Sequence, residues 1–112
     1  MQAVQISADD HRQAITAKFF HALSDLTRLR ILELLLDEGE QNVSEIVSAL
    51  GQSQGRISNH LACLRWCGYV DSRREGKFVH YRVSDPRVGE LVALARVIIA
   101  DNAKAILSCT RM

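Results

Sequence analysis

The sequence predicts a mainly α-helical domain with one small β-hairpin, and three observations support this fold class. Apolar residues recur every three or four positions through most of the chain, which is the period of an amphipathic helix. Over residues 69–83 the pattern changes to alternating apolar and polar residues around a Glu75-Gly76 pair, which is typical of a hairpin. With 112 residues and 47% hydrophobic content, residues 1–112 have the size and composition of a single globular domain.

The composition excludes several classes of protein. No apolar run reaches the roughly 18 residues of a membrane span, and no signal-peptide pattern opens the chain. We therefore expect a cytoplasmic protein that does not bind membranes. The net charge is only +1, but Lys and Arg outnumber Asp and Glu by seven to four within residues 51–90. A local basic excess of this kind is expected of a nucleic-acid-binding surface, although a solvated helix face produces it as well.

The N-terminal part of the chain predicts an arm and two helices. Residues 1–8 show little periodicity and are expected to form a flexible arm, whereas residues 9–23 carry an apolar stripe at helical spacing. The next helix has an N-cap at Ser24 or Asp25, both of which are favoured at that position. It ends in the acidic turn of residues 37–40.

Residues 42–67 have the pattern of two helices joined by a tight turn. Asn42 and Glu45 have the spacing of a capping box, which predicts the start of a short helix. A second helix follows a three-residue turn, with its N-cap at Ser53 and its end at Cys67. Such a helix-turn-helix places its second helix in the major groove of DNA.

The start of this second helix carries side chains that are suited to reading DNA. Asn and Gln amides pair with adenine, Arg pairs with guanine, and hydroxyl groups bind phosphates. The candidate contacts are Ser53, Gln54, Arg56, Ser58, Asn59 and His60. We expect about half of them to contact DNA. For His60 the alternative is a buried, hydrogen-bonded histidine.

The predicted hairpin of residues 69–83 carries three basic residues at or near its tip. These residues are Arg73, Arg74 and Lys77. A basic hairpin next to a helix-turn-helix is typical of a wing that reaches phosphates or the minor groove. The alternative is a solvated strand edge whose charges prevent aggregation.

Residues 86–107 predict a long last helix, because an Asp85-Pro86 pair is suited to a helix start. Its apolar face is too wide to be covered by the core of so small a domain. Pairing with a second copy of the chain is the simplest way to bury it, so we predict a homodimer with this helix at the interface. Residues 108–112 form a short tail.

Several segments resemble the ArsR/SmtB family of winged helix-turn-helix repressors. They are Ala-Leu-Ser-Asp-Leu-Thr-Arg-Leu-Arg-Ile-Leu at residues 22–32, Ser-Asn-His-Leu-x-x-Leu at residues 58–64, Gly68-Tyr69-Val70, and Glu75-Gly76-Lys77 followed by His80-Tyr81. The resemblance covers residues 15–107 and departs from the family at Leu26, where Pro is usual. It implies a homodimer that pairs through its first and last helices, binds an inverted repeat in double-stranded operator DNA, and releases it when metal binds.

The cysteines are the candidate inducer site. Cys63 and Cys67 are four residues apart, which places their Cβ atoms about 6 Å apart on one helical ridge. Two thiolates at that spacing can bind one soft ion, although two small buried apolar side chains would have the same pattern. Cys109 is the only other cysteine and lies on the tail, from which it could fold back. In a reducing compartment, three cysteines are thiols or metal ligands rather than disulfides.

The resemblance narrows this site to one branch of the family. Residues 63–68, Cys-Leu-Arg-Trp-Cys-Gly, are similar to the CmtR branch, which senses cadmium and lead through two recognition-helix cysteines and a C-terminal one. Residues 42–44 lack the Cys-x-Cys of arsenic sensors, and the last helix lacks the histidines of zinc sensors. Three thiolates suit soft ions better than Zn²⁺. We therefore expect Cd²⁺ or Pb²⁺ first, Hg²⁺ second and arsenite third.

These observations predict a metal-responsive transcriptional repressor with Cys63, Cys67 and Cys109 as ligands. The nearest alternative is a thiol redox switch or an arsenite sensor on the same scaffold. A metal-buffering protein without a DNA role is an alternative of another class. An enzyme is not expected, because the chain lacks Cys-x-x-Cys spacing and a Gly-rich phosphate loop. Weaker candidate ligands are His11, His21 and His80.

Overall fold

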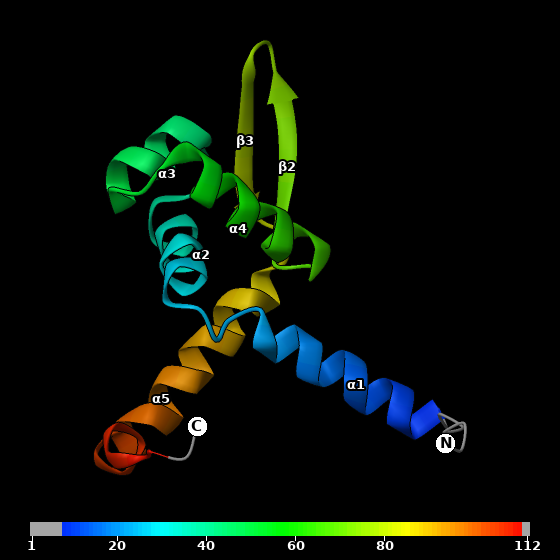
Figure 1. Cartoon of the computed structure of the whole chain (residues 1–112), viewed down its shortest axis with the longest axis vertical. Coiled ribbons are helices and arrows are strands. Elements are labelled where there is room, and N and C mark those ends of the chain that lie inside the picture. The colour runs from blue at the N-terminus through cyan, green and yellow to red at the C-terminus, as the bar shows by residue number, and fades with distance from the viewer. Residues whose placement is uncertain (1–7, 111–112) are drawn as a thin grey trace.

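The structure is a computed structural model that describes residues 8–110, which form five helices and three short strands. The elements are α1 (Ala8–His21), α2 (Leu26–Glu38), β1 (Gln41–Asn42), α3 (Val43–Leu50), α4 (Gln54–Trp66), β2 (Val70–Glu75), β3 (Phe78–Val83) and α5 (Pro86–Ser108). In Figure 1 the hairpin of β2 and β3 projects from the top of the molecule, while α1 and α5 extend from its base in different directions. This arrangement is the predicted winged helix-turn-helix.

The ends of the predicted elements differ slightly from the sequence-based boundaries. Ala8, which was assigned to the arm, already belongs to α1, and the rest of the arm lies outside the described residues. Cys67 is the C-cap of α4 rather than its last helical residue. Ser108 was assigned to the tail but is the last residue of α5, and its hydroxyl donates to the Lys104 carbonyl one turn earlier.

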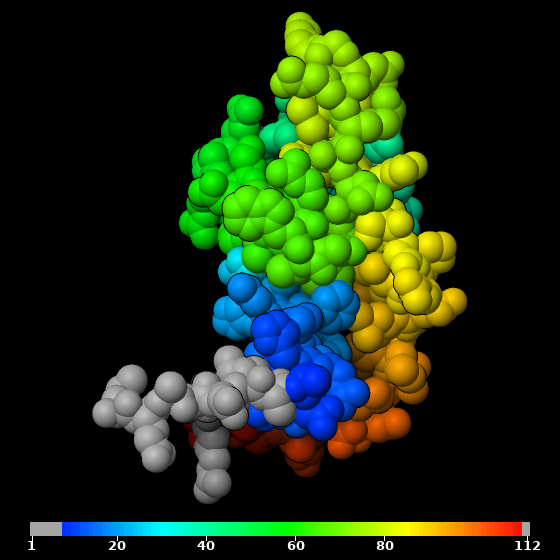
Figure 2. All heavy atoms as spheres, turned by 90° about the vertical axis from the view of Figure 1, so that its right-hand side faces the viewer, coloured from blue at the N-terminus to red at the C-terminus, as the bar shows by residue number. Residues whose placement is uncertain are grey.

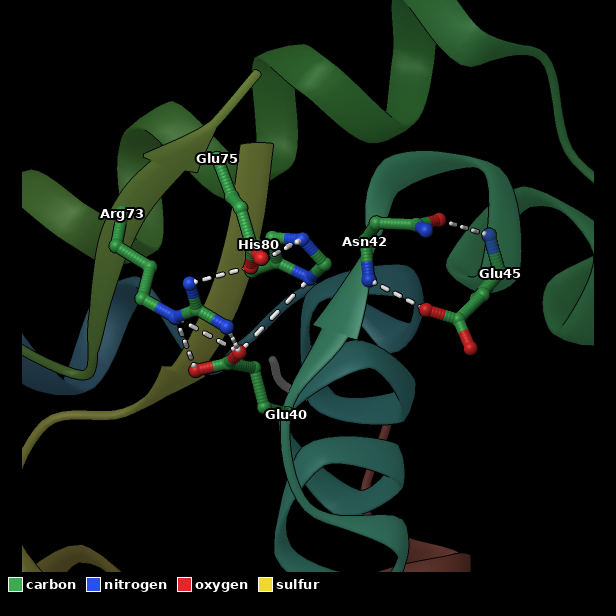
Figure 3. Close-up of polar contacts among 6 residues, drawn as sticks. All are labelled: Glu40, Asn42, Glu45, Arg73, Glu75 and His80. Carbon is green, nitrogen blue, oxygen red and sulfur yellow. Dashed lines mark hydrogen bonds and ion pairs between the residues drawn. The ribbon is translucent and has the colours of Figure 1, made fainter. Parts of the chain in front are cut away.

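The helix-turn-helix is fixed by its caps. Asn42 and Glu45 form the predicted capping box: each side chain accepts the other residue's amide at 2.9 Å, as Figure 3 shows. Gly51 ends α3 at φ 67°, a left-handed conformation that costs glycine little. The Ser53 hydroxyl then accepts the Arg56 amide at 3.3 Å and starts α4. The turn chemistry therefore fixes where α4 begins.

The sheet has one strand more than predicted. Its antiparallel order is β1-β3-β2, and Asn42 of β1 lies opposite His80 of β3. Two residues are too few to show strand alternation, so β1 left no periodic pattern in the sequence. The hairpin turn is also tighter than expected, because Glu75 is the last residue of β2 and Gly76 enters the turn at φ 61°. The wing is thus tied to the residues that precede α3.

The core lies where α2, α3, α4 and the base of the hairpin meet. Three α4 residues face inward: Ile57, Leu61 and Leu64 are each 0% exposed. They pack with buried residues of α2, α3, β2 and α5: Ile31, Leu32, Leu35, Ile46, Val70, Val88 and Val92. Burying this one face of α4 orients the opposite face toward solvent.

The two terminal helices are poorly covered in the single chain. None of the α1 residues is buried, and most of α5 beyond Val92 is exposed. The exposed apolar residues of α5 are Leu94, Val97, Ile98, Ile99, Ile106 and Leu107. An apolar surface of this extent marks an interaction site. Within residues 8–110, none of the helices combines the length and hydropathy of a membrane span.

Candidate functional site

The solvent-facing start of α4 carries most of the predicted DNA contacts. Side chains of five of these residues are exposed: Ser53, Gln54, Arg56, Ser58 and Asn59. They occupy the first two turns of the helix, and the wing hairpin stands beside α4 in Figure 1. The structure therefore places these polar groups together on one accessible surface. The N-terminal end of a helix also favours phosphate, because its unpaired amides carry partial positive charge.

His60 is placed differently from the other candidates. It is half-buried, with Nδ1 3.4 Å from an Arg28 guanidinium nitrogen and Nε2 3.9 Å from the Asp25 carboxylate. Arg28 is itself anchored, because its Nε donates to the Ala22 carbonyl at 2.6 Å. The Arg28 amide hydrogen bond, aided by His60, holds the pKa of Asp25 below its usual range. His60 thus has the surroundings of the alternative interpretation, a hydrogen-bonded histidine that connects α4 to the start of α2.

Arg73 of the predicted wing contacts is engaged within the protein. Its Nε donates to both carboxylate oxygens of Glu40, at 2.9 and 3.1 Å, and another of its nitrogens contacts Glu75 at 2.8 Å (Figure 3). These bonds to Arg73 lower the pKa values of Glu40 and Glu75. His80 lies 3.8 Å from each carboxylate. Arg74 and Lys77 are exposed at the tip.

This carboxylate cluster was not predicted. Glu40 is 33 residues from Arg73 in the sequence, and only the pairing of β1 with β3 brings them together. One sequence feature could have indicated this cluster: the acidic turn at residues 37–40 has an excess of carboxylates without a basic partner nearby in the sequence. The cluster links the wing to the residues that precede α3.

The Cys63 and Cys67 thiols lie together at the C-terminal end of α4. Both side chains are half-buried, and the Cys67 amide donates to the Cys63 carbonyl at 3.0 Å. Burial raises the pKa of the Cys67 thiol, and the neighbouring Cys63, with which it is hydrogen-bonded, raises it further. Because the thiols are adjacent and partly accessible, and because Cys63 disfavours ionisation of Cys67, one soft cation can bind both of them.

The two thiols open into a largely apolar cavity between α1 and α4. The cavity has a volume of about 590 Å³ and is lined by Ile15, Lys18, Phe19, Asn59, Ala62, Cys63, Trp66 and Cys67. Figure 2 shows the blue atoms of α1 lying against the green atoms of α4 on this side of the molecule. One wall residue, Asn59, is also a predicted DNA contact, so the cavity extends from the two thiols to the predicted DNA-contacting residues of α4.

Cys109 does not join the other two cysteines in the single chain. It is exposed at the C-cap of α5, where its amide donates to the Ile106 carbonyl at 3.2 Å. Across residues 8–110, no group of three or more His, Cys, Asp or Glu side chains could hold a metal ion. That range includes His11, His21 and His80, the weaker candidate ligands. One chain therefore offers a soft ion two neighbouring sulfur atoms.

A contact between α1 and the end of α4 was also not predicted. The rings of Phe19 and Tyr69 are stacked with centroids 4.4 Å apart, and the Tyr69 hydroxyl donates to the Phe19 carbonyl at 2.8 Å. Tyr69 is fully buried, and burial raises its pKa to about 12. The sequence did not predict that these two aromatic residues meet, because they are 50 positions apart. This contact holds α1 against the segment that follows Cys67.

Comparison with known proteins identifies the family. Residues 25–72 match the model of the arsR family of bacterial regulatory proteins. The chain is 54% identical to a probable mercury resistance operon repressor of Streptomyces lividans, over 87% of this chain and 77% of the relative. It is 38% identical to the HTH-type transcriptional regulator CmtR of Mycobacterium bovis, over 81% of this chain and 80% of that protein.

Solved structures agree with this comparison. The homodimeric winged helix-turn-helix DNA-binding domain of a Mycobacterium bovis protein has a TM-score of 0.77 at 35% identity, covering 90% of this chain and 92% of that one. The relatives are transcriptional regulators, which confirms the expectation that the chain is not an enzyme. The reading helix, the wing and these similarities together show that the chain belongs to the arsR family of bacterial transcriptional regulators.

Proposed function

We propose that the chain is a cytoplasmic, homodimeric repressor that binds double-stranded operator DNA and releases it when a soft metal ion binds its cysteines. One observation carries this proposal: the thiol pair and the DNA-facing side chains lie on the same 13-residue helix, α4, and its C-cap. A change in the position of the thiol end must therefore reach the reading end through a rigid element. The similarity to repressors of metal-resistance operons supports the same conclusion.

Dimerisation is supported by the apolar surface of the terminal helices. In the single chain, large apolar side chains of α1 and α5 are exposed, including Phe20, Val97 and Ile98. Pairing two copies through these helices would bury them and place two α4 helices on one side of the dimer. Related recognition helices lie about 34 Å apart, one turn of DNA. The operator would accordingly be an inverted repeat.

In this proposal α4 reads bases while the wing contacts the backbone. Gln54, Arg56 and Asn59 present amide and guanidinium groups to the major groove, and Ser53 and Ser58 present hydroxyls to phosphates. Arg74 and Lys77 add phosphate contacts from the tip of the wing. Arg73 reaches DNA only by exchanging a carboxylate for a phosphate, so we assign it a smaller contribution to DNA affinity than Arg74 and Lys77. His60 acts mainly by holding α4 against α2.

The donor set fits a soft ion. Cys63 and Cys67 would hold it through two thiolates, and the ion would neutralise the charge of the Cys67 thiolate, which burial and the neighbouring Cys63 disfavour. Two sulfur atoms satisfy Hg²⁺, whereas Cd²⁺, Pb²⁺ and arsenite need a third. Cys109 of the same chain is not at the site, so we propose that the partner subunit supplies it when a third ligand is required.

The release mechanism follows from the position of the two cysteines. An ion that binds both sulfur atoms fixes the last turn of α4 relative to α1, because Phe19 and Tyr69 join α1 to the segment after Cys67. The resulting rotation or bend displaces Arg56 and Asn59 from their bases. A coupling free energy of about 1–3 kcal/mol, or 5- to 150-fold in affinity, is typical of such regulation.

An operator-binding assay tests the proposal. Fluorescence anisotropy would follow the reduced protein on DNA from upstream of its own gene, with Cd²⁺, Pb²⁺, Hg²⁺ and arsenite added separately. We expect Cys63→Ser and Cys67→Ser to abolish release by every ion, and Cys109→Ser to abolish it only for ions that need three sulfurs. Ser108→Ala is the matched control for Cys109→Ser.

Two results would contradict this function. Undiminished release in both Cys63→Ser and Cys67→Ser would place the inducer site elsewhere. Release by peroxide alone, together with a disulfide detected by mass spectrometry and no response to any metal, would establish the thiol redox switch instead.

A further inference from the structure

The cavity beside the thiols is larger and more apolar than a bare metal ion needs. An apolar cavity of about 150 Å³ already holds a benzene ring in another protein. The cavity between α1 and α4 measures about 590 Å³. Its walls include the side chains of Ile15, Phe19, Ala62 and Trp66, and both thiols open into it. Room for an organic group therefore lies directly beside two sulfur atoms.

The wall residues also have unusual exposure for their type. Trp66 is 81% exposed and Ile15 is 60% exposed, although both are large and apolar. Exposed apolar side chains that gather around a hollow mark a binding site for an apolar group. The neighbouring sulfur atoms specify what that group must carry, since thiols bind soft metals.

We propose that this cavity binds monoorganomercury cations, R–Hg⁺, with R an aryl or alkyl group. The metal bonds to the sulfur of Cys63 or Cys67, and R lies among Ile15, Phe19 and Trp66. The Cys thiol gives its proton to solvent, the halide or acetate on mercury leaves, and a mercury–sulfur bond forms. The carbon–mercury bond stays intact and no electrons are transferred. The second thiol adds a weaker contact to the same mercury.

This inference deepens the proposed function by naming a class of inducer for the same two cysteines. It requires the thiols of the proposed function but not its coupling to DNA. Its test therefore measures binding alone. Loss of DNA release would then count against the proposed function, and loss of selectivity for the organic group would count against this inference.

The test compares phenylmercury with methylmercury in full-length protein carrying Cys109→Ser, which removes the tail thiol. Competition with glutathione, read by native mass spectrometry, gives the preference of each cation for the protein over a free thiol. The ratio of the two preferences cancels the intrinsic mercury–sulfur affinity and isolates the contribution of R. Because burial of a phenyl ring stabilises binding more than burial of a methyl group, we expect a phenyl preference of about tenfold or more.

Two variants alter the cavity, and one matched control does not. Ala62→Leu fills part of the cavity, and Trp66→Ala removes a wall side chain that is 81% exposed. Both should reduce the phenyl preference about tenfold, towards that of glutathione. Arg65 is exposed and adjacent to Trp66 in the sequence but does not line the cavity. Arg65→Ala should therefore keep the phenyl preference.

Equal phenyl-to-methyl ratios in Trp66→Ala, Ala62→Leu and Arg65→Ala would overturn the inference. A ratio of one in the Cys109→Ser protein itself would overturn it as well. A fluorescence titration adds a second readout, because Trp66 is the only tryptophan and lies on the cavity wall. Phenylmercury should quench it stoichiometrically in the Cys109→Ser protein, and this quenching should be lost when Cys63 and Cys67 are both Ser.

Discussion

The two ends of α4 differ in how they meet their surroundings. At the N-terminal end, Gln54, Arg56 and Asn59 point into solvent from a helix whose other face is buried. At the C-terminal end, Cys63 and Cys67 are half-buried against α1 beside the Phe19–Tyr69 contact. In the proposed function, one end meets a ligand as large as DNA, and the other closes on a small one.

This difference would let one helix bind the inducer at one end and contact DNA at the other. The N-terminal end is held by its cap and by the buried Ile57, so its side chains stay accessible while their backbone is fixed. The C-terminal end is held in the core by Leu61 and Leu64 and also meets α1, a helix that has no buried residue. A ligand at the thiols can therefore shift α1 against α4 with little loss of core packing. The following predictions separate the two ends.

Replacing Arg56 and Asn59, the proposed base contacts, should have the largest effect. Arg56→Ala combined with Asn59→Ala should weaken operator binding at least thirtyfold, because each base contact contributes about 1–3 kcal/mol. Affinity for Hg²⁺ should change much less, because neither replaced residue supplies a sulfur ligand. Anisotropy and glutathione competition measure the two quantities. Arg30 is an exposed arginine on α2, so Arg30→Ala is the control. An equal loss of DNA binding in this variant would contradict the assignment of Arg56 and Asn59 as base contacts.

Changing the pH should alter the binding of metal at the thiol end. Burial raises the pKa of Cys67, so the protonated thiol predominates at neutral pH and the metal must displace its proton. The apparent affinity for Cd²⁺ should therefore rise about tenfold or more per pH unit below that pKa. Chelator competition between about pH 6 and 8 measures the slope. A flat profile would contradict the assignment of Cys67 as a ligand.

Removing the Tyr69 hydroxyl should loosen the junction of α1 with the thiol end. Tyr69→Phe loses the hydrogen bond to the Phe19 carbonyl and should destabilise the fold by about 1–2 kcal/mol in urea unfolding. The raised pKa of about 12 also means that burial favours the neutral phenol. That contribution is complete below the unfolded pKa of about 10 and is lost as the pH rises towards the folded value. A Tyr69→Phe protein as stable as the wild type would show that the contact does not hold α1.

The wing should give the smallest effect and shows whether basic residues act alike. Lys77→Ala should weaken binding a few-fold for all sequences and reduce the slope of log Kd against log salt by about one. Arg73→Ala should reduce that slope less, because Glu40 and Glu75 already compensate its charge. Titrations between about 50 and 200 mM salt measure both slopes. Equal slopes for the two variants would show that Arg73 leaves its carboxylates when DNA binds.

The sequence was sufficient for the features that depend on local chemistry. The caps at Asn42 and Ser53 and the helices that they begin were predicted, because each rests on residues within one or two turns. The Glu40–Arg73 link and the Phe19–Tyr69 contact were not, since residues 33 and 50 positions apart meet only through the tertiary fold. The third sulfur ligand also stays a prediction, because it depends on a second copy of the chain.

The most direct test of the coupling between thiols and DNA is the Cd²⁺ affinity of the protein with and without operator DNA. Binding free energies are reciprocal, so an ion that weakens DNA binding must itself bind more weakly to the DNA complex, by the same factor. Chelator competition should give a dissociation constant for Cd²⁺ that is 5- to 150-fold higher, as is typical of allosteric coupling, when operator is saturating. Equal Cd²⁺ affinities in the free and DNA-bound protein would contradict the account.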